Sequence, residues 1–389
     1  LMMSSLAQYD SFLSIYICLL ATIPCVILGL LGKRSKVVNL VVSAVMVITI
    51  LGLQTFQMLQ FLLFLIWELL LIYLYYGFRK RCSSDLMYYI VLALSILPIF
   101  IIRMAGALHF YDSYLGFVGL SYICFKIWQI LLEIHDGSIE KLSFGDVLGN
   151  FLFFPSYSSG PIMRYQEFQN ECQKALDRRI YVAEYLLPGA KKIILGLFYK
   201  YAIAFFINTY FLEKLPEGAA VGTVILYAYG YTLYLFFVFA GFSMIAIGYG
   251  TLMGIKLPEN FNKPFLARNM KEFWGRWHMS LSNWFNDYVF GRFVLNNVRN
   301  GLFKNTKIAA RWAYMFSMTT MGLWHGFSLH YLVYGLYEGA ILVVTDLYVR
   351  SKLYRKVKKK KWFDWVSRVI CFQFIALGML IFSGHFWAK

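Results

Sequence analysis

Charged side chains are scarce in this sequence. Asp, Glu, Lys and Arg make up 15% of its 389 residues, whereas an ordinary soluble domain has about a quarter. Hydrophobic residues make up 60%, and the mean hydropathy is +0.59. This composition excludes an ordinary soluble domain and favours a protein that spans a membrane.

The chain also lacks the usual signatures of metal, disulfide and hydrolase sites. Its six cysteines form no CxxC pair and no metal-type spacing, so we interpret them as small hydrophobic residues. The sequence contains no HExxH, no GxSxG and no Walker loop. We therefore expect no bound metal and no tightly bound cofactor, and Ser282 has no evident partners for a serine triad.

Long apolar runs separate the few charges. A helix needs about 20 apolar residues to cross a bilayer core of roughly 30 Å. The first run, residues 19–32, lacks the basic flank and cleavage site of a signal peptide. The pattern predicts an all-α polytopic membrane protein with spans near 11–32, 37–56, 57–77, 86–104, 114–134, 190–212, 221–247, 309–327, 331–348 and 366–387.

Two stretches do not fit as simple spans. In residues 144–165, Pro155, Gly160 and Pro161 interrupt any continuous helix, and residues 262–300 mix aromatic with charged side chains. Irregular backbone survives at membrane depth only inside protein or beside a wet cavity. We therefore expect a ring of about 10–11 transmembrane helices with re-entrant or interfacial segments around a central cavity. With no internal repeat, residues 1–389 are predicted to form a single domain, with N-terminal spans in 1–134, central spans in 190–247 and C-terminal spans in 309–387.

Acidic residues are fewer than basic ones, and the formal charge is +17. The basic residues cluster in 32–36, 78–82 and 350–361, as is typical of cytoplasmic loops. This arrangement puts the N-terminus outside and gives no reason to expect nucleic acid. The basic face either signals topology alone or also attracts anionic lipid or an acidic soluble partner.

Four ionisable residues fall inside predicted spans: Glu68, Lys126, Lys200 and Glu338. Charges at this depth face protein or water rather than lipid. They either pair with one another as structural contacts or mark a substrate path.

The stretch "EFWGRWHMSLSNWFNDYVF", residues 272–290, reads as an amphipathic helix. At about 100° per residue, a polar stripe runs from Glu272 to Asp287, and His278 falls on the opposite aromatic side with Trp274 and Trp277. One interpretation places this helix in the membrane interface with a tryptophan belt. The other places His278 in an enclosed site, where desolvation keeps the imidazole neutral.

A second histidine lies in "MTTMGLWHGFSLH", residues 318–330. Gly322 and Gly326 flank His325 at a spacing that lets another helix approach closely. His330 lies about 140° further around a helix, so the two are not expected to act as a pair. His325 either packs helices or, without metal or covalent nucleophile, deprotonates a hydroxyl that attacks an activated acyl group such as a thioester.

Four ordered motifs resemble the membrane-bound O-acyltransferase family. They are "FFPSYSSGPIMRY", "FAGFSMIAIG…LMGIKLPENFNKP", "FNKPFLARNMKEFWGRWHMSLSNWFNDYVF" and "MGLWHGFSLHYLVYG", and they cover at least residues 150–340. After the "DY" element, the chain resembles the branch that transfers D-alanine to teichoic acids rather than the polysaccharide O-acetyltransferases.

The resemblance implies a catalytic His325 and a second histidine at His278, in a thin centre reached from both membrane faces. Along this substrate channel we place Trp274, Trp277, Ser282, Asp287 and Trp324. The donor would be D-alanine on the phosphopantetheine thioester of a small acidic carrier protein at the cytoplasmic face. The acceptor would be a hydroxyl of lipoteichoic acid, reached directly or through an outer-face partner, at the plasma membrane of a Gram-positive bacterium.

The segment 291–300 mixes apolar and basic residues. We propose Arg292, Val294, Leu295 and Arg299 as a docking edge for the carrier, and plain interfacial anchoring is the alternative.

The chain departs from the family pattern at Val238, Asn286 and Glu338. The first two positions often carry Asp and Arg, so their polar roles are in doubt here. Many relatives carry His at the position of Glu338, which makes Glu338 a candidate for local compensation. A transporter or channel, and a scaffold that only recruits a partner, stay open as alternatives from the residues themselves.

Overall fold

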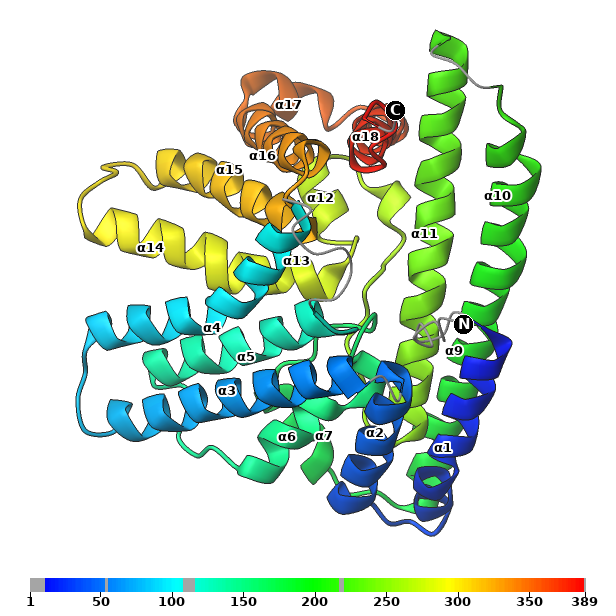
Figure 1. The fold of residues 1–389 in the computed structure, drawn as a ribbon. Coiled ribbons are helices and arrows are strands. Elements are labelled where there is room, and N and C mark those ends of the chain that lie inside the picture. Colours follow the sequence, from blue (N-terminus) through cyan, green and yellow to red (C-terminus); the bar gives the residue numbers. More distant parts are fainter. Residues whose placement is uncertain (1–10, 53–54, 108–115, 217–219, 388–389) are drawn as a thin grey trace. The chain divides into compact units, whose positions relative to one another are not determined.

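A computed structural model describes residues 11–52, 55–107, 116–216 and 220–387 (Figure 1). Residues 53–54 and 114–115, which belong to the predicted spans 37–56 and 114–134, lie outside this set. Within the described residues the only regular elements are helices. The predicted all-α class is confirmed.

The chain divides into two compact units. Unit 1 contains residues 1–197 and 241–258, and unit 2 contains 198–240 and 259–389. In unit 1 the helices α3, α4 and α5 contact one another and run side by side in Figure 1. The elements that begin in unit 1 are α1 (Phe12–Leu30), α2 (Lys36–Leu51), α3 (Thr55–Arg79), α4 (Asp85–Ala107), α5 (Leu120–Asp136), α6 (Phe144–Leu152), η1 (Phe154–Ser156), α7 (Tyr165–Gln173), α8 (Arg178–Ile180), η2 (Tyr181–Leu186) and α9 (Leu187–Phe198).

Unit 2 holds the candidate site. Its helices α15 and α16 pack along their length, and α18 packs on α16. The elements that begin here are η3 (Tyr199–Ala204), α10 (Phe205–Tyr210), η4 (Leu212–Lys214), α11 (Val221–Leu252), η5 (Pro264–Leu266), α12 (Met270–Trp274), α13 (Met279–Phe285), η6 (Asn286–Phe290), α14 (Gly291–Arg299), α15 (Thr306–His325), α16 (Leu329–Arg350), α17 (Lys352–Val357) and α18 (Phe363–Phe382). Helix α11 continues from unit 2 into unit 1.

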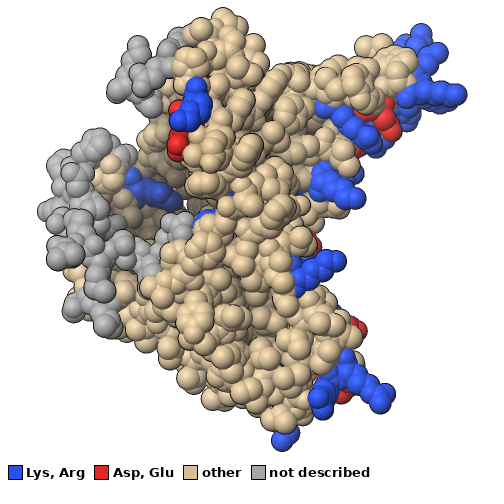
Figure 2. Space-filling model, turned by 90° about the vertical axis from the view of Figure 1, so that its right-hand side faces the viewer, with Lys and Arg blue, Asp and Glu red and all other residues tan. Residues whose placement is uncertain are grey.

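Seven helical stretches of the described chain are long and apolar enough to cross a membrane. They are Phe12–Leu30, Phe56–Arg79, Asp85–Gly106, Arg178–Lys214, Val221–Leu252, Leu329–Arg350 and Phe363–Phe382. Lys36–Leu51 is apolar but shorter, and the predicted spans 114–134 and 309–327 fall on α5 and α15, which are not among the seven. Figure 2 shows lysine and arginine in a few groups on a face that is otherwise mostly neither acidic nor basic. The chain is a multi-pass membrane protein.

The predicted interruption in residues 144–165 is confirmed. Helix α6 ends at Leu152, a short 3-10 turn contains Pro155, and regular helix resumes only at Tyr165. The Lys126 ammonium donates to the Asn150 carbonyl at 2.7 Å and to Ser156 Oγ at 2.9 Å. Because Lys126 is 1% exposed, these bonds hold the irregular backbone inside protein, where it is tolerated.

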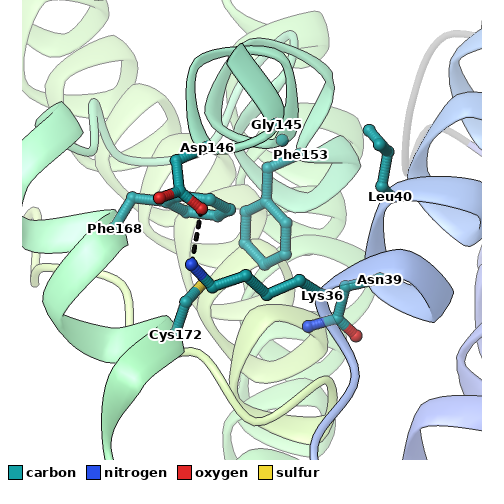
Figure 3. Close-up of a pocket in the computed structure, with 9 residues that line it drawn as sticks. Lys36, Asn39, Leu40, Gly145, Asp146, Phe153, Phe168 and Cys172 are labelled. Atoms are coloured by element: carbon teal, nitrogen blue, oxygen red, sulfur yellow. Dashed lines mark hydrogen bonds and ion pairs between the residues drawn. The ribbon is translucent and has the colours of Figure 1, made fainter. Parts of the chain in front are cut away.

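A basic residue at the start of α2 also anchors this region. Lys36 Nζ lies 2.6 Å from Asp146 Oδ1 (Figure 3). Asp146 Oδ2 accepts a second bond from the Gln169 amide at 3.1 Å. The carboxylate therefore joins α2, α6 and α7, and the basic 32–36 turn is fixed to unit 1.

The ionisable residues in the predicted spans bond to neutral groups. Ser95 donates to Glu68 Oε2 at 2.7 Å, and Trp274 Nε1 donates to Glu338 Oε2 at 3.0 Å. Lys200 Nζ lies 3.4 Å from the Tyr201 hydroxyl. Glu68, Lys126 and Glu338 are at most 1% exposed, so they are structural contacts in the packed interior rather than the acid–base pairs that we considered.

Candidate active site

His278 has an unusual backbone conformation. Its φ of 44° and ψ of 50° lie in the left-handed region, and Lys263 is the only other described non-glycine residue with positive φ. Such a conformation costs free energy for a residue with a Cβ and persists only where surrounding contacts impose it. Strain of this kind concentrates at functional sites.

Asn260 supplies contacts that hold this turn. The Asn260 carbonyl accepts from the Met279 amide at 2.9 Å, and its side-chain oxygen accepts from the Ser280 hydroxyl at 2.6 Å. Asn260 is 1% exposed. These bonds fix the first turn of α13, so the imidazole of His278 projects from a rigid helix start.

The His278 ring is enclosed among aromatic side chains. The residue is 5% exposed, and Phe239 meets the imidazole edge-on with centroids 4.6 Å apart. Its buried Nδ1 has no hydrogen-bond partner from another residue of the described chain. Burial, and secondarily the charge of His325, lower the pKa of His278 to about 3. The segment lies outside the seven apolar stretches, and its imidazole is neutral at pH 7.

The prediction of one continuous amphipathic helix over 272–290 is wrong. Helix α12 ends at Trp274, residues 275–278 form a turn, α13 covers 279–285, and a π-helical turn follows. The reason is the left-handed residue at His278, together with the Asn260 bonds, which start a new helix axis. At helical spacing Ser280 would fall on the polar stripe between Glu272 and Asp287, but it is buried against Asn260.

Trp274 and Trp277 are both buried, but Trp274 makes a hydrogen bond and Trp277 packs against aromatic rings. Trp274 bonds to Glu338 as described above, and a Cβ at Gly378 would collide with the second oxygen of that carboxyl. Helices α12, α16 and α18 are thereby tied together around one acid. Trp277 packs among phenylalanines, stacking on Phe273 at 5.5 Å and meeting others edge-on or tilted: Phe236, Phe261 and Phe265.

His325 is the last residue of α15 and is half-buried. Its ring stacks on Tyr331 at 5.7 Å and meets Phe382 edge-on at 5.0 Å. Trp324 lies edge-on at 4.7 Å. The imidazole is therefore partly accessible at a helix end, in an aromatic setting.

Glycines bring α16 close to the histidine. A Cβ at Gly322 would collide with the Tyr331 carbonyl oxygen and lie 3.0 Å from Gly335. The predicted close helix approach is confirmed at Gly322. Gly326 lies beyond the helix end, and a Cβ added there would lie 2.9 Å from the Tyr331 ring, so Gly326 shapes the turn rather than the helix contact.

The two histidines lie within electrostatic reach of each other. A protonated His325 disfavours protonation of His278, and this effect is second only to burial. His330 has no such effect on His278. Two histidines 47 positions apart in sequence, both in unit 2, thus influence each other electrostatically.

The remaining predicted channel residues have varied settings. Ser282 donates from its hydroxyl to the Trp277 carbonyl at 3.1 Å, and Trp324 is half-buried. Asp287 is exposed on η6, where Asn286 Nδ2 donates to it at 3.0 Å. Asp287 therefore lies outside the enclosed part of the site.

The predicted docking edge lies on α14. Leu295 is 70% exposed, and Arg299 is also exposed. Arg292 and Val294 are half-buried, and the Arg292 guanidinium lies 6.0 Å from the Tyr288 ring centroid. Exposed apolar and basic residues continue beyond the helix, at Leu302, Lys304 and Lys307.

Sequence reasoning assigned no role to Asn260, Phe239 or Tyr331. Each contacts a candidate histidine or the turn that carries it. Asn260 lies in "LPENFNKP", where an asparagine in a turn-rich stretch signals side-chain bonding to backbone. Its partners are about 20 residues away, which that local signal does not specify.

Sequence comparisons show which known proteins this chain resembles. The sequence model of the membrane-bound O-acyltransferase family matches residues 131–384. A teichoic acid D-alanyltransferase of Bacillus subtilis (strain 168) is 38% identical over 97% of this chain and 98% of its own length. A teichoic acid D-alanyltransferase of Streptococcus thermophilus is 36% identical over 82% of this chain and 80% of its own.

A more distant relative is a probable alginate O-acetylase of Pseudomonas aeruginosa. It is 27% identical over 69% of this chain and 49% of its own length. The match to the family model, residues 131–384, covers the positions of both histidines. The chain therefore belongs to the membrane-bound O-acyltransferase family and is an O-acyltransferase.

Proposed function

We propose that the protein transfers D-alanine from the phosphopantetheine thioester of an acidic carrier protein to a hydroxyl of a teichoic acid. The observation that carries the proposal is a pair of imidazoles with an electrostatic influence on each other: His278 is buried, neutral and has a left-handed backbone, and His325 is half-buried at the end of α15. The names of the similar D-alanyltransferases supply the acyl group and the acceptor class.

The reaction needs one base and a fixed geometry. His325 accepts the proton of the acceptor hydroxyl as its oxygen attacks the thioester carbonyl carbon. The tetrahedral intermediate collapses, the C–S bond breaks, and the carrier thiolate takes up the proton from His325. The acyl group is already activated, so alignment of the two substrates supplies much of the rate.

His278 is a positioning residue in this scheme. A neutral imidazole has one N–H donor and one acceptor nitrogen, so it can orient the donor or the attacking group without adding charge. Its unpartnered Nδ1 and its fixed backbone suit a hydrogen bond to substrate. The desolvated surroundings strengthen such a bond.

The carrier would dock at the exposed edge of α14. Leu295 offers an apolar contact, and Arg299, Lys304 and Lys307 offer positive charge. A phosphopantetheine carrier of acidic character complements both, and charge complementarity mainly raises the association rate.

The test uses the purified full chain in lipid nanodiscs with D-alanyl-loaded carrier and teichoic acid. We expect thioester consumption together with D-alanyl ester on the teichoic acid, detected by mass spectrometry. Recruitment of the carrier without thioester consumption would indicate a scaffold. Passage of an intact substrate across the bilayer without ester formation would indicate a conduit.

A further inference from the structure

Unit 1 contains a cavity of about 430 Å³ where α3 begins, α4 ends and α5 begins. Its lining combines polar residues and glycines with apolar side chains: Gln57, Arg103, Gly116, Gly119, Ser121 and Ser158 with Ile102, Phe117, Val118, Leu120 and Tyr122. None of the described lining residues is acidic. The family assignment and the proposed reaction make no use of this cavity.

Two sources of positive potential meet in the cavity. Arg103 Nη2 donates to Ser121 Oγ at 2.9 Å, which holds the guanidinium against the first turn of α5. Helix α5 has 17 residues, and its N-cap, Gly119, makes no side-chain capping bond. The partial positive charge of a helix N-terminus favours anions. A planar guanidinium with five N–H donors binds phosphate oxygens in pairs while it keeps a serine contact.

The cavity wall is preorganised. The Gly116 amide donates to Gln60 Oε1 at 2.8 Å, so the turn that precedes α5 is fixed to α3. Gly116 and Gly119 have φ of 108° and 92°, and a Cβ on Gly119 would press on the Tyr157 ring at 2.6 Å. The backbone path that opens the cavity therefore requires glycine.

The positions of the basic loops predict that the cavity lies at the outer end of its helices. The basic turn at 78–82 marks the cytoplasmic side, and α4 begins just after it, at Asp85. Arg103 follows at a distance of about 27 Å along the helix. This length nearly spans the hydrocarbon core of roughly 30 Å, so the cavity opens near the opposite face.

We propose that this cavity is a phosphodiester-binding site at the outer membrane face, in which Arg103 and the N-terminus of α5 hold the phosphate. Its volume falls in the range of small-molecule sites and suits a glycerol-phosphate-sized unit. Following from the proposed function, we assign the phosphodiester to the teichoic acid acceptor. A bilayer phosphatidylglycerol headgroup has the same chemistry and is separated by experiment.

Binding is tested without donor, so that catalysis does not enter. The full chain is purified in dodecyl maltoside, a detergent that contains no phosphate, and titrated with a soluble glycerol-phosphate oligomer by calorimetry. We expect Arg103→Gln to weaken binding at least about 10-fold, since a charge-assisted bond contributes this much, and Arg103→Lys to restore part of it. Lys214→Gln is the control, because it removes one exposed positive charge from a residue that does not line the cavity and should leave binding unchanged.

Further measurements identify the ligand and distinguish loss of binding from misfolding. Ser121→Asp keeps Arg103 but fills the site with a carboxylate, so it should abolish binding in a chain whose melting temperature is unchanged. Arg103-dependent binding of short-chain phosphatidylglycerol added to the detergent, with no binding of the oligomer, would support the site and assign it to lipid. Inorganic phosphate should compete only weakly.

The site fails if no Arg103-dependent binding of either phosphodiester is found, or if Lys214→Gln weakens binding equally. His325→Ala should bind the oligomer like the wild type. Loss of transfer with normal binding therefore tests the proposed function, and loss of Arg103-dependent binding tests this site.

Discussion

At the scale of single residues, His278 combines a strained backbone with a desolvated side chain. The left-handed conformation is imposed by Asn260 and by the start of α13. The imidazole gains no hydrogen bond at Nδ1 from the described chain in return for its burial. Backbone strain and a buried unsatisfied polar atom that occur together are typical of a functional site.

The depressed pKa of His278 makes stability depend on pH. His278 has a pKa of about 3 in the folded state and about 6.5 in the unfolded state. Above about pH 6.5 the imidazole is neutral in both states, so its protonation does not lower the free energy of unfolding. Between these values the unfolded chain binds the extra proton, so stability falls as pH falls. We expect a loss of about 1.4 kcal/mol per pH unit below 6.5.

Thermal unfolding in detergent between pH 7.5 and 4.5 checks this prediction, with His278→Gln as the comparison. The variant should lack the component of the slope that His278 contributes. Parallel pH profiles for the two proteins would show that His278 is not held neutral by the fold.

Glu338 tests whether a buried acid positions Trp274. Glu338→Gln keeps a carbonyl oxygen for the Trp274 N–H, so we expect a melting temperature and transfer rate near those of the wild type. Glu338→Leu leaves that N–H buried without an acceptor, which costs about 1–3 kcal/mol. Equal damage from both substitutions, measured by thermal unfolding, would mean that the negative charge itself is required.

At the scale of elements, the contact of α15 with α16 sets the position of His325. Gly322 faces the backbone of α16 with no room for a side chain. We expect Gly322→Ala to destabilise the protein by about 1–3 kcal/mol and to lower the transfer rate, because the helix that ends at His325 is displaced.

Gly77 is the matched control for this change. It lies in α3, and a Cβ added there would have no neighbouring atom within 4 Å, so Gly77→Ala should be neutral or stabilise by up to about 1 kcal/mol. Thermal unfolding and transfer rates of both variants check the prediction. A tolerated Gly322→Ala would show that the close approach is not needed.

The sequence predicted the elements better than their interruptions. Apolar runs of bilayer length predict membrane-spanning helices directly. The helix-breaking residues Pro155, Gly160 and Pro161 predicted the interruption after α6. The break inside 272–290 had no such signal, because a histidine in the left-handed region is rare and Asn260 imposes it from about 20 residues away. Helical periodicity alone therefore gave one helix where there are two.

The same limit applies to the candidate site. His278 and His325 could be selected from their residue type and neighbours. The contacts of Asn260, Phe239 and Tyr331 depend on which segments meet in the fold, and a single sequence does not contain that information. The mutual pairing that we considered for the intramembrane charges is not found for Glu68 or Glu338, since each bonds to a neutral side chain, Ser95 and Trp274 respectively.

At the scale of the whole molecule, function requires a soluble partner and a membrane enzyme to meet. The exposed edge of α14 carries apolar and basic side chains, and Arg299 is an exposed cation at its end. We expect Arg299→Glu to raise the KM for the carrier about 10-fold with little change in kcat, because a repulsive charge slows association.

Lys214→Glu makes the same change in charge at another exposed position and should leave the KM unchanged. Steady-state kinetics with loaded carrier at two salt concentrations check this, and the difference between the variants should shrink at high salt. An equal rise in KM for both variants would mean that the net charge of the protein, and not a docking edge on α14, determines the KM for the carrier.

The most direct test of the account is the rate at which His325→Ala consumes the D-alanyl carrier thioester in the presence of teichoic acid. With the base removed, we predict a rate at least about 100-fold below that of the wild type, with an unchanged melting temperature and a normal rate for His330→Ala. A wild-type rate for His325→Ala would contradict the claim that this imidazole activates the acceptor hydroxyl.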